Sequence, residues 1–252
     1  MSTPGEADLS AVGRLLAEPA RARALMALSD GRWLPASMLA LEAGVAASTM
    51  SGHLTRLVDG GLLTVRQHGR YRYYRLAGAE VAELVEVMAK LAPTLTIASL
   101  RQHTRAHALR RARRCYDHLG GRIAVAITAA LIRDGFLIGS DDRTGPSRED
   151  EAEAPGAAVL EPGAYTLTDV GAAFLHDELK LAIPPLTAVR CCVDWTEHRH
   201  HTAGRLGREL LADFESRGWL ASARQPRVLT LSAGGRRGLA QIFGIEIDDQ
   251  AA

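Results

Sequence analysis

Long hydrophobic runs are absent from this chain of 252 residues: no stretch approaches the roughly 18 apolar residues that a membrane-spanning helix needs. The first residues, MSTPGEADLS, have neither a basic start nor an apolar core, so we expect no export signal. Cysteine is scarce as well. Three cysteines are too few for a disulfide framework and suit a reducing compartment. We therefore predict a cytoplasmic protein with no membrane partner.

Sequence motifs of the common enzyme classes are also missing. The chain has no glycine-rich phosphate loop, no activated-serine motif and no metal-hydrolase motif. One catalytic arrangement stays open, a thiol nucleophile with a histidine base, which Cys115 with His118 or Cys192 with His198 would supply. We do not expect an enzyme, because catalysis would leave the pattern of residues 44–76 unexplained.

Net charge is nearly absent, at +1, but the charges are segregated along the chain. Residues 66–75 contain four arginines and no acid, and residues 101–114 contain six arginines and no acid. Residues 141–153 are rich in Asp and Glu. A locally basic segment attracts a polyanion even where the whole chain is close to neutral.

The composition, with 47% hydrophobic and 23% charged residues, is that of a globular protein. A chain of this length holds one large domain or two of ordinary size. Because the character of the sequence changes near residue 100, we predict one domain over 1–100 and a second over 101–252.

Residues 44–76 predict a turn, a helix and a hairpin, in the order of a DNA-reading winged helix. The turn begins at Gly44, and the helix is expected over 47–59. Apolar residues recur at helical spacing on one face of this helix and leave polar side chains on the others. These apolar residues are Met50, Leu54, Leu57 and Val58. Two strands, 62–65 and 71–76, follow with a turn at 67–70, and they form the expected wing.

The next helix has the apolar rhythm of a helix that pairs with another helix. Its apolar residues step by three and four positions, at Val81, Leu84, Met88 and Leu91. An ordinary core helix is the alternative. We favour a homodimer seam, because dimeric readers double their DNA contacts through two-fold symmetry.

An internal repeat fills the second half. Residues 118–137 match 201–220 without gaps, and 166–171 resemble 230–235. Each copy predicts a helix, a glycine corner, a strand pair and a closing helix. The first copy carries extra residues at about 139–162, which predict an exposed loop insertion.

In the first third of the chain, Pro35 is predicted to be the first residue of a helix over the segment ASMLALEAG.

The first third of the chain resembles the ArsR family of dimeric winged-helix repressors. The resemblance is carried by Glu18-Pro19-Ala20-Arg21, by MLALEAGV, by STMSGHLTRLVDGGLL and by RQHGRYRYYRL. It implies that polar side chains of the 47–59 helix face the major groove, that Arg56 contacts a phosphate, and that two wing arginines contact the backbone or minor groove. The groove-facing residues would be Ser48, Thr49, Ser51 and His53, and the wing arginines Arg70 and Arg72.

The sequence departs from this family at several positions. Ala46 stands where the family has a helix-capping Ser, and Gly52 replaces a longer polar side chain. The family's metal sensors carry cysteines before the turn or Asp and His ligands on the dimer helix. Here residues 37–43 contain no Cys and residues 81–91 contain no His, so any signal is expected to enter elsewhere. Beyond residue 100 the chain looks like long family members with an extra C-terminal domain.

Metal ligands are candidates within the repeat. The ungapped repeat alignment sets Cys115 opposite His198 and His118 opposite His201, and residues three apart lie on one helical face. The two pairs predict a four-ligand Cys/His set for zinc or another thiophilic ion. A small organic effector between the repeats, or no ligand, are the alternatives, as is a thiol sensor using Cys191 and Cys192.

Together these patterns predict a mainly α protein with short β hairpins, in the α+β class. It has an N-terminal winged helix-turn-helix and a C-terminal domain of two tandem winged-helix-like repeats. The predicted function is a homodimeric transcriptional repressor of a double-stranded DNA operator. An effector in the C-terminal domain, a metal ion or a small molecule, would release the DNA.

Overall fold

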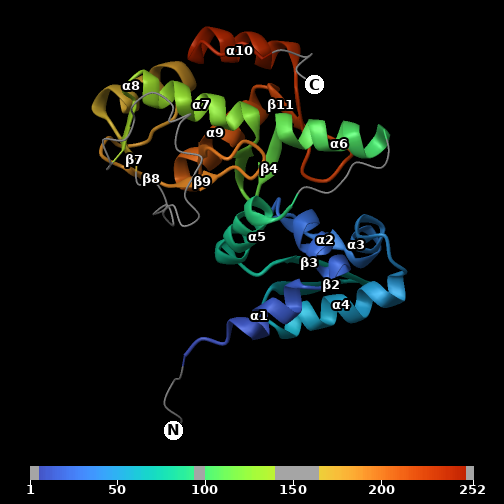
Figure 1. The fold of residues 1–252 in the computed structure, drawn as a ribbon. Helices are drawn as coiled ribbons and strands as arrows, with labels where there is room; N and C mark the ends of the chain where they lie inside the picture. The colour runs from blue at the N-terminus through green and yellow to red at the C-terminus, as the bar shows by residue number, and fades with distance from the viewer. Residues whose placement is uncertain (1–5, 94–99, 140–164, 248–252) are drawn as a thin grey trace. The chain divides into compact units, whose positions relative to one another are not determined.

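The computed structural model describes residues 6–93, 100–139 and 165–247, which belong to two compact units, 1–88 and 89–252 (Figure 1). Helices and short strands are mixed in both units. Within these described ranges, no helix is both long and apolar enough to cross a bilayer. The expected loop insertion at about 139–162 lies, apart from Gly139, outside the described residues.

The first unit contains helices around a small antiparallel sheet. The elements are α1 (Leu9–Leu16), α2 (Pro19–Leu28), β1 (Leu34–Pro35), α3 (Ala36–Ala43), α4 (Ala47–Asp59), β2 (Leu63–His68), β3 (Tyr71–Leu76) and the start of α5 (Ala79–Leu91). The strand order is β1-β3-β2. Because α3, a short turn and α4 precede the β2–β3 hairpin, the unit has the winged helix-turn-helix arrangement.

The helix predicted over 47–59 is confirmed as α4. Met50, Leu54 and Leu57 are completely buried and anchor it to α2 and α3. This apolar face fixes the helix, because burying one such side chain is worth about 1.5–3 kcal/mol. Gly44, with φ of +71°, ends α3 in the left-handed conformation and opens the turn into α4.

The wing is longer than the sequence predicted. β2 continues to His68, which pairs with Tyr71, so the turn is only Gly69 and Arg70. Gly69 has φ of +58°, which a two-residue hairpin turn requires and glycine adopts without strain. The prediction that Pro35 is the first helical residue is also wrong. Pro35 is extended and pairs with Tyr73 in β1, where a missing N–H costs little at a sheet edge.

The described part of the second unit contains helices and four small antiparallel sheets. Its elements after α5 are α6 (Leu100–Arg111), β4 (Arg113–Cys115), β5 (His118–Gly120), α7 (Arg122–Arg133), β6 (Leu137–Gly139), β7 (Tyr165–Leu167), α8 (Asp169–Leu179), β8 (Ala188–Val189), β9 (Cys191–Val193), β10 (His200–Thr202), α9 (Gly204–Ser216), β11 (Leu220–Ser222), β12 (Leu229–Leu231) and α10 (Ala233–Phe243). One hydrophobic core, including Ile123, Leu131, Leu211 and Phe214, joins both copies of the repeat.

The repeat has the same element order in both copies. β4–β5, α7, β6–β7 and α8 in the first correspond to β9–β10, α9, β11–β12 and α10 in the second. Each closing helix has a capping hydroxyl, Thr168 or Ser232, which accepts the N–H of Gly171 or Gly235. These two glycines lie against the backbone of Phe136 and Trp219, respectively, where a Cβ would approach within 2.4 Å and 2.7 Å of a carbonyl oxygen.

One helix was predicted in the wrong place. Residues 115–118 and the start of the repeat at His118 were expected to be helical, but they form the β4–β5 hairpin, and α7 begins at Arg122. The reason is local: Gly120 and Gly121 interrupt the helical pattern, and Gly121 has φ of +91°.

Candidate functional sites

The exposed face of α4 carries hydrogen-bonding side chains. Ser48, Thr49, Ser51 and Arg56 are exposed. Ala46, at the N-cap, supplies no capping hydrogen bond from its side chain, so the first backbone N–H groups of α4 receive no side-chain acceptor from that position. A polar, exposed face on a helix anchored by its other side has the form that the major groove accepts. Base contacts by these residues stay a prediction.

His53 lies apart from that exposed face. Its side chain is half-buried, and Nε2 is 3.6 Å from a carboxylate oxygen of Glu18, the residue that caps α2. A histidine that contacts this carboxylate has less freedom to reach a base edge than the three hydroxyl residues do. Its predicted role at the major groove therefore has the weakest geometric support of the set.

The wing presents arginines from both strands. Arg70 and Arg72 are exposed, as a backbone contact with DNA requires. Trp33, which the sequence did not single out, lies between two other arginines, with the guanidinium carbons of Arg66 and Arg75 at 4.4 Å and 4.8 Å from its ring centroid. Such cation–π contacts fix the base of the wing. Because Trp33 precedes β1 and is far from these arginines along the chain, no local pattern in the sequence indicates this contact.

The predicted seam residues of α5 point away from the core. Val81 and Leu84 are half-buried, while Met88 and Leu91 are 39% and 78% exposed. The side chains that α5 buries are instead Ala82, Val85 and Glu86. Helix α1 buries no residue at all, although its apolar side chains recur at helical spacing. Among the described residues, both helices thus keep apolar side chains that are only partly covered.

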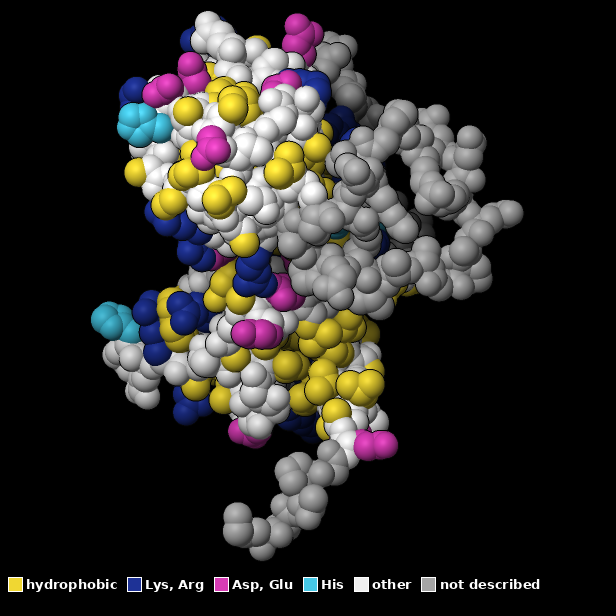
Figure 2. Space-filling model, turned by 90° about the vertical axis from the view of Figure 1, so that its left-hand side faces the viewer, with side chains coloured by type: hydrophobic (Ala, Val, Ile, Leu, Met, Phe, Trp, Pro, Cys, Tyr) yellow, Lys and Arg dark blue, Asp and Glu magenta, His cyan; other side chains and the backbone are white. Residues whose placement is uncertain are grey.

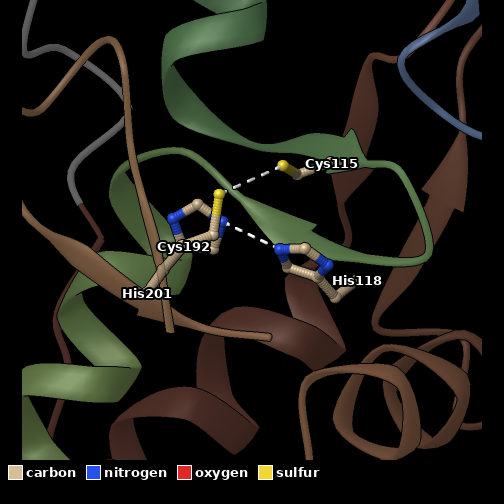
Figure 3. Close-up of side chains that lie close together, drawn as sticks. All are labelled: Cys115, His118, Cys192 and His201. Atoms are coloured by element: carbon tan, nitrogen blue, oxygen red, sulfur yellow. Dashed lines mark hydrogen bonds between the residues drawn. The ribbon is translucent and has the colours of Figure 1, made fainter. Parts of the chain in front are cut away.

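Two cysteines and two histidines meet inside the second unit (Figure 3). The residues are Cys115, His118, Cys192 and His201, and their four ligand atoms all lie within 4.8 Å of one another. The two sulfurs are 4.0 Å apart, and the two Nε2 atoms are 3.1 Å apart. Cys115, His118 and His201 are buried, and Cys192 is half-buried.

Strand register brings each cysteine to its histidine. Cys115 pairs directly with His118 across β4–β5, and Cys192 pairs directly with His201 across β9–β10. Residues opposite each other in an antiparallel pair project to the same side of the sheet. Each copy of the repeat therefore contributes one cross-strand Cys–His pair, and the two pairs face each other.

The structure brings together three of the four predicted ligands and replaces the fourth. His198 is exposed, in the loop between β9 and β10, and is not part of the cluster. Cys192 occupies its place, because the loop from Cys192 to His201 is longer than the two-residue turn between Cys115 and His118. An ungapped alignment of the two copies cannot account for this difference in loop length. Gapping the alignment within this loop would have matched the two cysteines.

The histidines of the cluster have opposite electrostatic surroundings. Burial opposes protonation of His118, but the Cys115 thiol and the Asp117 carboxylate, 3.1 Å from Nδ1, outweigh it and raise the pKa of His118 to about 9. Burial and the neighbouring His118 lower the pKa of His201 well below its ordinary value. The 3.1 Å contact between the two Nε2 atoms requires one ring to donate a hydrogen bond and the other to accept it.

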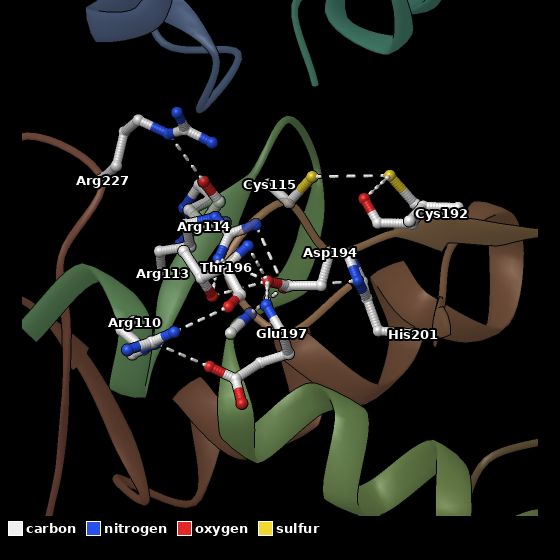
Figure 4. Close-up of polar contacts among 12 residues, drawn as sticks. Arg110, Arg113, Arg114, Cys115, Cys192, Asp194, Thr196, Glu197, His201 and Arg227 are labelled. Carbon is white, nitrogen blue, oxygen red and sulfur yellow. Dashed lines mark hydrogen bonds and ion pairs between the residues drawn. The ribbon is translucent and has the colours of Figure 1, made fainter. Parts of the chain in front are cut away.

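A buried ion pair lies directly behind the cluster (Figure 4). Arg113 and Asp194 are both completely buried, with guanidinium nitrogens at 3.0 Å and 3.2 Å from the carboxylate oxygens. Asp194 also accepts the N–H of Gly121 at 2.6 Å and both the N–H and the hydroxyl of Thr196. Although burial alone would raise it, Arg113 holds the pKa of Asp194 well below its ordinary range.

The same carboxylate orients the cluster. An Asp194 oxygen lies 3.5 Å from Nδ1 of His201, which has no hydrogen-bond partner, whereas Nδ1 of His118 is hydrogen-bonded to Asp117; in both rings Nδ1 is on the carboxylate side and Nε2 faces the cluster. Outer carboxylates of this kind fix the ring orientation of metal-binding histidines. The sequence contained both aspartates beside the ligands, but only the fold shows which histidine each one contacts.

The alternative ligand sites have less support. A pocket of about 160 Å³ lined by Arg110, Arg111 and Arg122 is smaller than the roughly 300–1,000 Å³ of typical small-molecule sites. Cys191 and Cys192 are neighbours on a strand, where successive side chains point to opposite faces. Burial also raises the pKa of Cys191 to about 12, which makes its thiol a poor partner for a sensing pair.

Comparison with known proteins gives one relative over nearly the whole chain and others over about its first third. The uncharacterized HTH-type transcriptional regulator YdfF of Bacillus subtilis is 31% identical, over 95% of this chain and 99% of YdfF. The HTH-type transcriptional regulator CmtR of Mycobacterium tuberculosis is 40% identical, over 33% of this chain and 73% of CmtR. Among solved structures, the homodimeric winged helix-turn-helix DNA-binding domain of Mb0332 from Mycobacterium bovis is 30% identical, over 35% of this chain and 89% of that domain, with a TM-score of 0.31. No family model matches the chain.

Proposed function

Because the chain belongs to the ArsR family of HTH-type transcriptional regulators, we propose that this DNA-binding regulator is a dimeric repressor. It binds a pseudo-palindromic operator and releases it when an effector binds in the 89–252 unit. An effector acts this way only if it binds the DNA-free state more tightly than the DNA-bound state. In this proposal the protein works in the cytoplasm, and its cysteines have no catalytic role.

The exposed polar face of α4 beside a basic wing is the observation that supports this function. In this proposal the exposed residues Ser48, Thr49 and Ser51 read base edges, and the exposed Arg56 contacts a phosphate. Arg70 and Arg72 supply salt-dependent affinity from the wing. His53 is the remaining reader, once it leaves Glu18.

The dimer is supported by apolar side chains of α1 and α5 that the described residues cover only in part. Figure 2 looks onto the side of the first unit that carries α1 and α5, and hydrophobic side chains gather there. The proposed seam of α5 comprises Val81, Leu84, Met88 and Leu91. Two-fold symmetry would then present two α4 helices to successive major grooves.

The 89–252 unit is proposed as two tandem winged-helix-like repeats that hold the effector. Support comes from the shared element order of a helix, a hairpin and a closing helix in each copy. A metal ion and a small organic molecule are the two effector classes that the sequence left open. The cysteine–histidine cluster favours the metal ion.

The test of DNA reading is a double variant, Arg70→Ala with Arg72→Ala. DNA is first selected from a random-sequence library with the wild-type protein, and binding is then titrated at several salt concentrations. Removing two phosphate contacts should weaken binding to all sequences and lower the slope of log K against log salt by about 2. Arg237→Ala, which removes an exposed arginine of α10, is the matched control and should leave the slope unchanged. A wild-type slope in the double variant would remove the wing from the DNA interface.

Release is tested on the same selected DNA. Affinity is measured with zinc, with chelator and with candidate organic ligands. A change in affinity with one of them supports the regulated repressor. Affinity unchanged by all of them would instead favour a constitutive DNA-binding protein.

A further inference from the structure

We infer that Cys115, His118, Cys192 and His201 form a Cys2His2 site for one thiophilic divalent cation, and that the cation is Zn²⁺. The site lies wholly within the second unit, away from the segments where the family's metal sensors carry ligands. Residues 37–43 contain no Cys, and residues 81–91 contain no His. It is therefore a separate metal centre, which belongs to the C-terminal repeats.

The distances in the cluster match a tetrahedron around zinc. With Zn–S of about 2.3 Å and Zn–N of about 2.0–2.1 Å, a regular tetrahedron has about 3.8 Å between its sulfurs and about 3.3 Å between its nitrogens. The structure has 4.0 Å between the sulfurs and 3.1 Å between the Nε2 atoms. All the remaining ligand pairs are within 4.8 Å. A regular tetrahedron has about 3.6 Å between a sulfur and a nitrogen, so binding one central ion would draw the cysteine and histidine side chains closer together by up to about 1 Å.

The donor set selects the class of ion. Two thiolates and two imidazoles suit zinc and similar thiophilic ions, whereas Mg²⁺ and Ca²⁺ prefer oxygen ligands. Two thiolates would also balance the two charges of the cation in a buried place. Asp117 and Asp194 stand behind His118 and His201 at Nδ1 and leave Nε2 for the metal.

An ion at this site would connect the two copies of the repeat. Helix α7 packs against β10, and α9 packs against β5, so each helix of the repeat lies on the hairpin of the other copy. An ion held by one Cys–His pair from each hairpin would fasten the two copies at this crossing. Because an unfolded chain does not preform such a site, the binding energy adds to the stability of the unit.

The experiment uses the full-length protein, reduced and stripped of metal with a chelator. Co²⁺ is then titrated as a coloured substitute for Zn²⁺. We expect about one ion per chain, with thiolate-to-cobalt charge transfer and the visible bands of tetrahedral cobalt, and Zn²⁺ should displace it. Cys115→Ser and Cys192→Ser should each weaken Co²⁺ binding by more than about 100-fold, beyond the loss caused by an outer partner.

Two control variants come from neighbours of the ligands. Cys191→Ser removes the adjacent thiol, and His198→Gln removes the exposed histidine of the same loop; both should bind Co²⁺ like the wild type. If the reduced wild-type protein does not bind about one Co²⁺ per chain, the proposed metal site is wrong. So would an equal loss in Cys191→Ser and Cys192→Ser. If a serine variant does not fold, the charge-transfer intensity of the wild type still shows whether two thiolates bind.

The metal site and DNA binding can be tested independently on the same protein samples. Binding to the library-selected DNA is measured beside the Co²⁺ titration. A complete cobalt site without DNA binding counts against the repressor alone. DNA binding by a protein that takes up no Co²⁺ counts against the metal site and against a metal ion as the effector, while the DNA-binding role stands.

Discussion

At the scale of single residues, the most consequential side chain outside the proposed sites is Asp194. It is completely buried and holds Arg113, Gly121, Thr196 and His201 in one network. A buried ion pair is costly to form, so its presence alone says little about stability. Removing one partner is different, because the other charge then stays buried without compensation.

Asp194→Asn should therefore destabilise the second unit by about 3–5 kcal/mol. The measurement is chemical denaturation followed by tryptophan fluorescence, since Trp195 stacks 5.0 Å from the Arg113 guanidinium. Glu209→Gln is the control. It breaks the Arg205–Glu209 pair on the surface of α9, where an exposed pair is worth about 0–1 kcal/mol. Equal losses in the two variants would show that the buried pair has no special role.

At the scale of elements, helices α4 and α9 each contain an interior glycine in different surroundings. A Cβ on Gly207 of α9 would lie 2.5 Å from the carbonyl oxygen of Thr202 and 3.0 Å from Cβ of His118. A Cβ on Gly52 of α4 would meet nothing within 4 Å. The first glycine permits a helix to pack tightly on the metal-site hairpins, and the second only weakens its helix.

The same substitution should consequently have opposite effects at these two positions. Gly207→Ala should destabilise the protein by about 1–3 kcal/mol through overpacking. Gly52→Ala should stabilise it by about 0.5–1 kcal/mol through helix propensity. Thermal unfolding of both variants, with the transition of each unit assigned, gives the comparison. A destabilised Gly52→Ala would mean that this face of α4 is not open.

At the scale of the whole molecule, the uncovered apolar face of α5 makes assembly testable. Met88→Glu with Leu91→Glu places two charges in the proposed seam and should convert the dimer to a monomer, because a charge buried without a partner is strongly unfavourable. Light scattering after size-exclusion chromatography measures the mass. Val170→Glu, at an apolar residue of α8 that is 66% exposed, is the matched control. An unchanged dimer mass in the double variant would place the seam elsewhere.

The sequence alone determined the winged helix and, in each copy of the repeat, the helix, strand pair and closing helix, but not the hairpin that precedes them. Those features depend on local patterns: the apolar spacing of Met50, Leu54 and Leu57, and glycines at turns such as Gly69 and Gly135. Such patterns depend only on residues close together in the chain, so they can be recognised from the sequence without knowledge of the tertiary structure. The DNA-binding function followed from the same stretch.

Only the tertiary structure decided which residues form the cysteine–histidine cluster. Spacing in the sequence favoured His198, but strand register selects Cys192, because the pairing of a hairpin is fixed by the length of its loop and by which face is buried. The Arg113–Asp194 pair and the arginines on Trp33 likewise join residues distant along the chain. Sequence periodicity carries no information about such contacts, which arise when separate elements pack together.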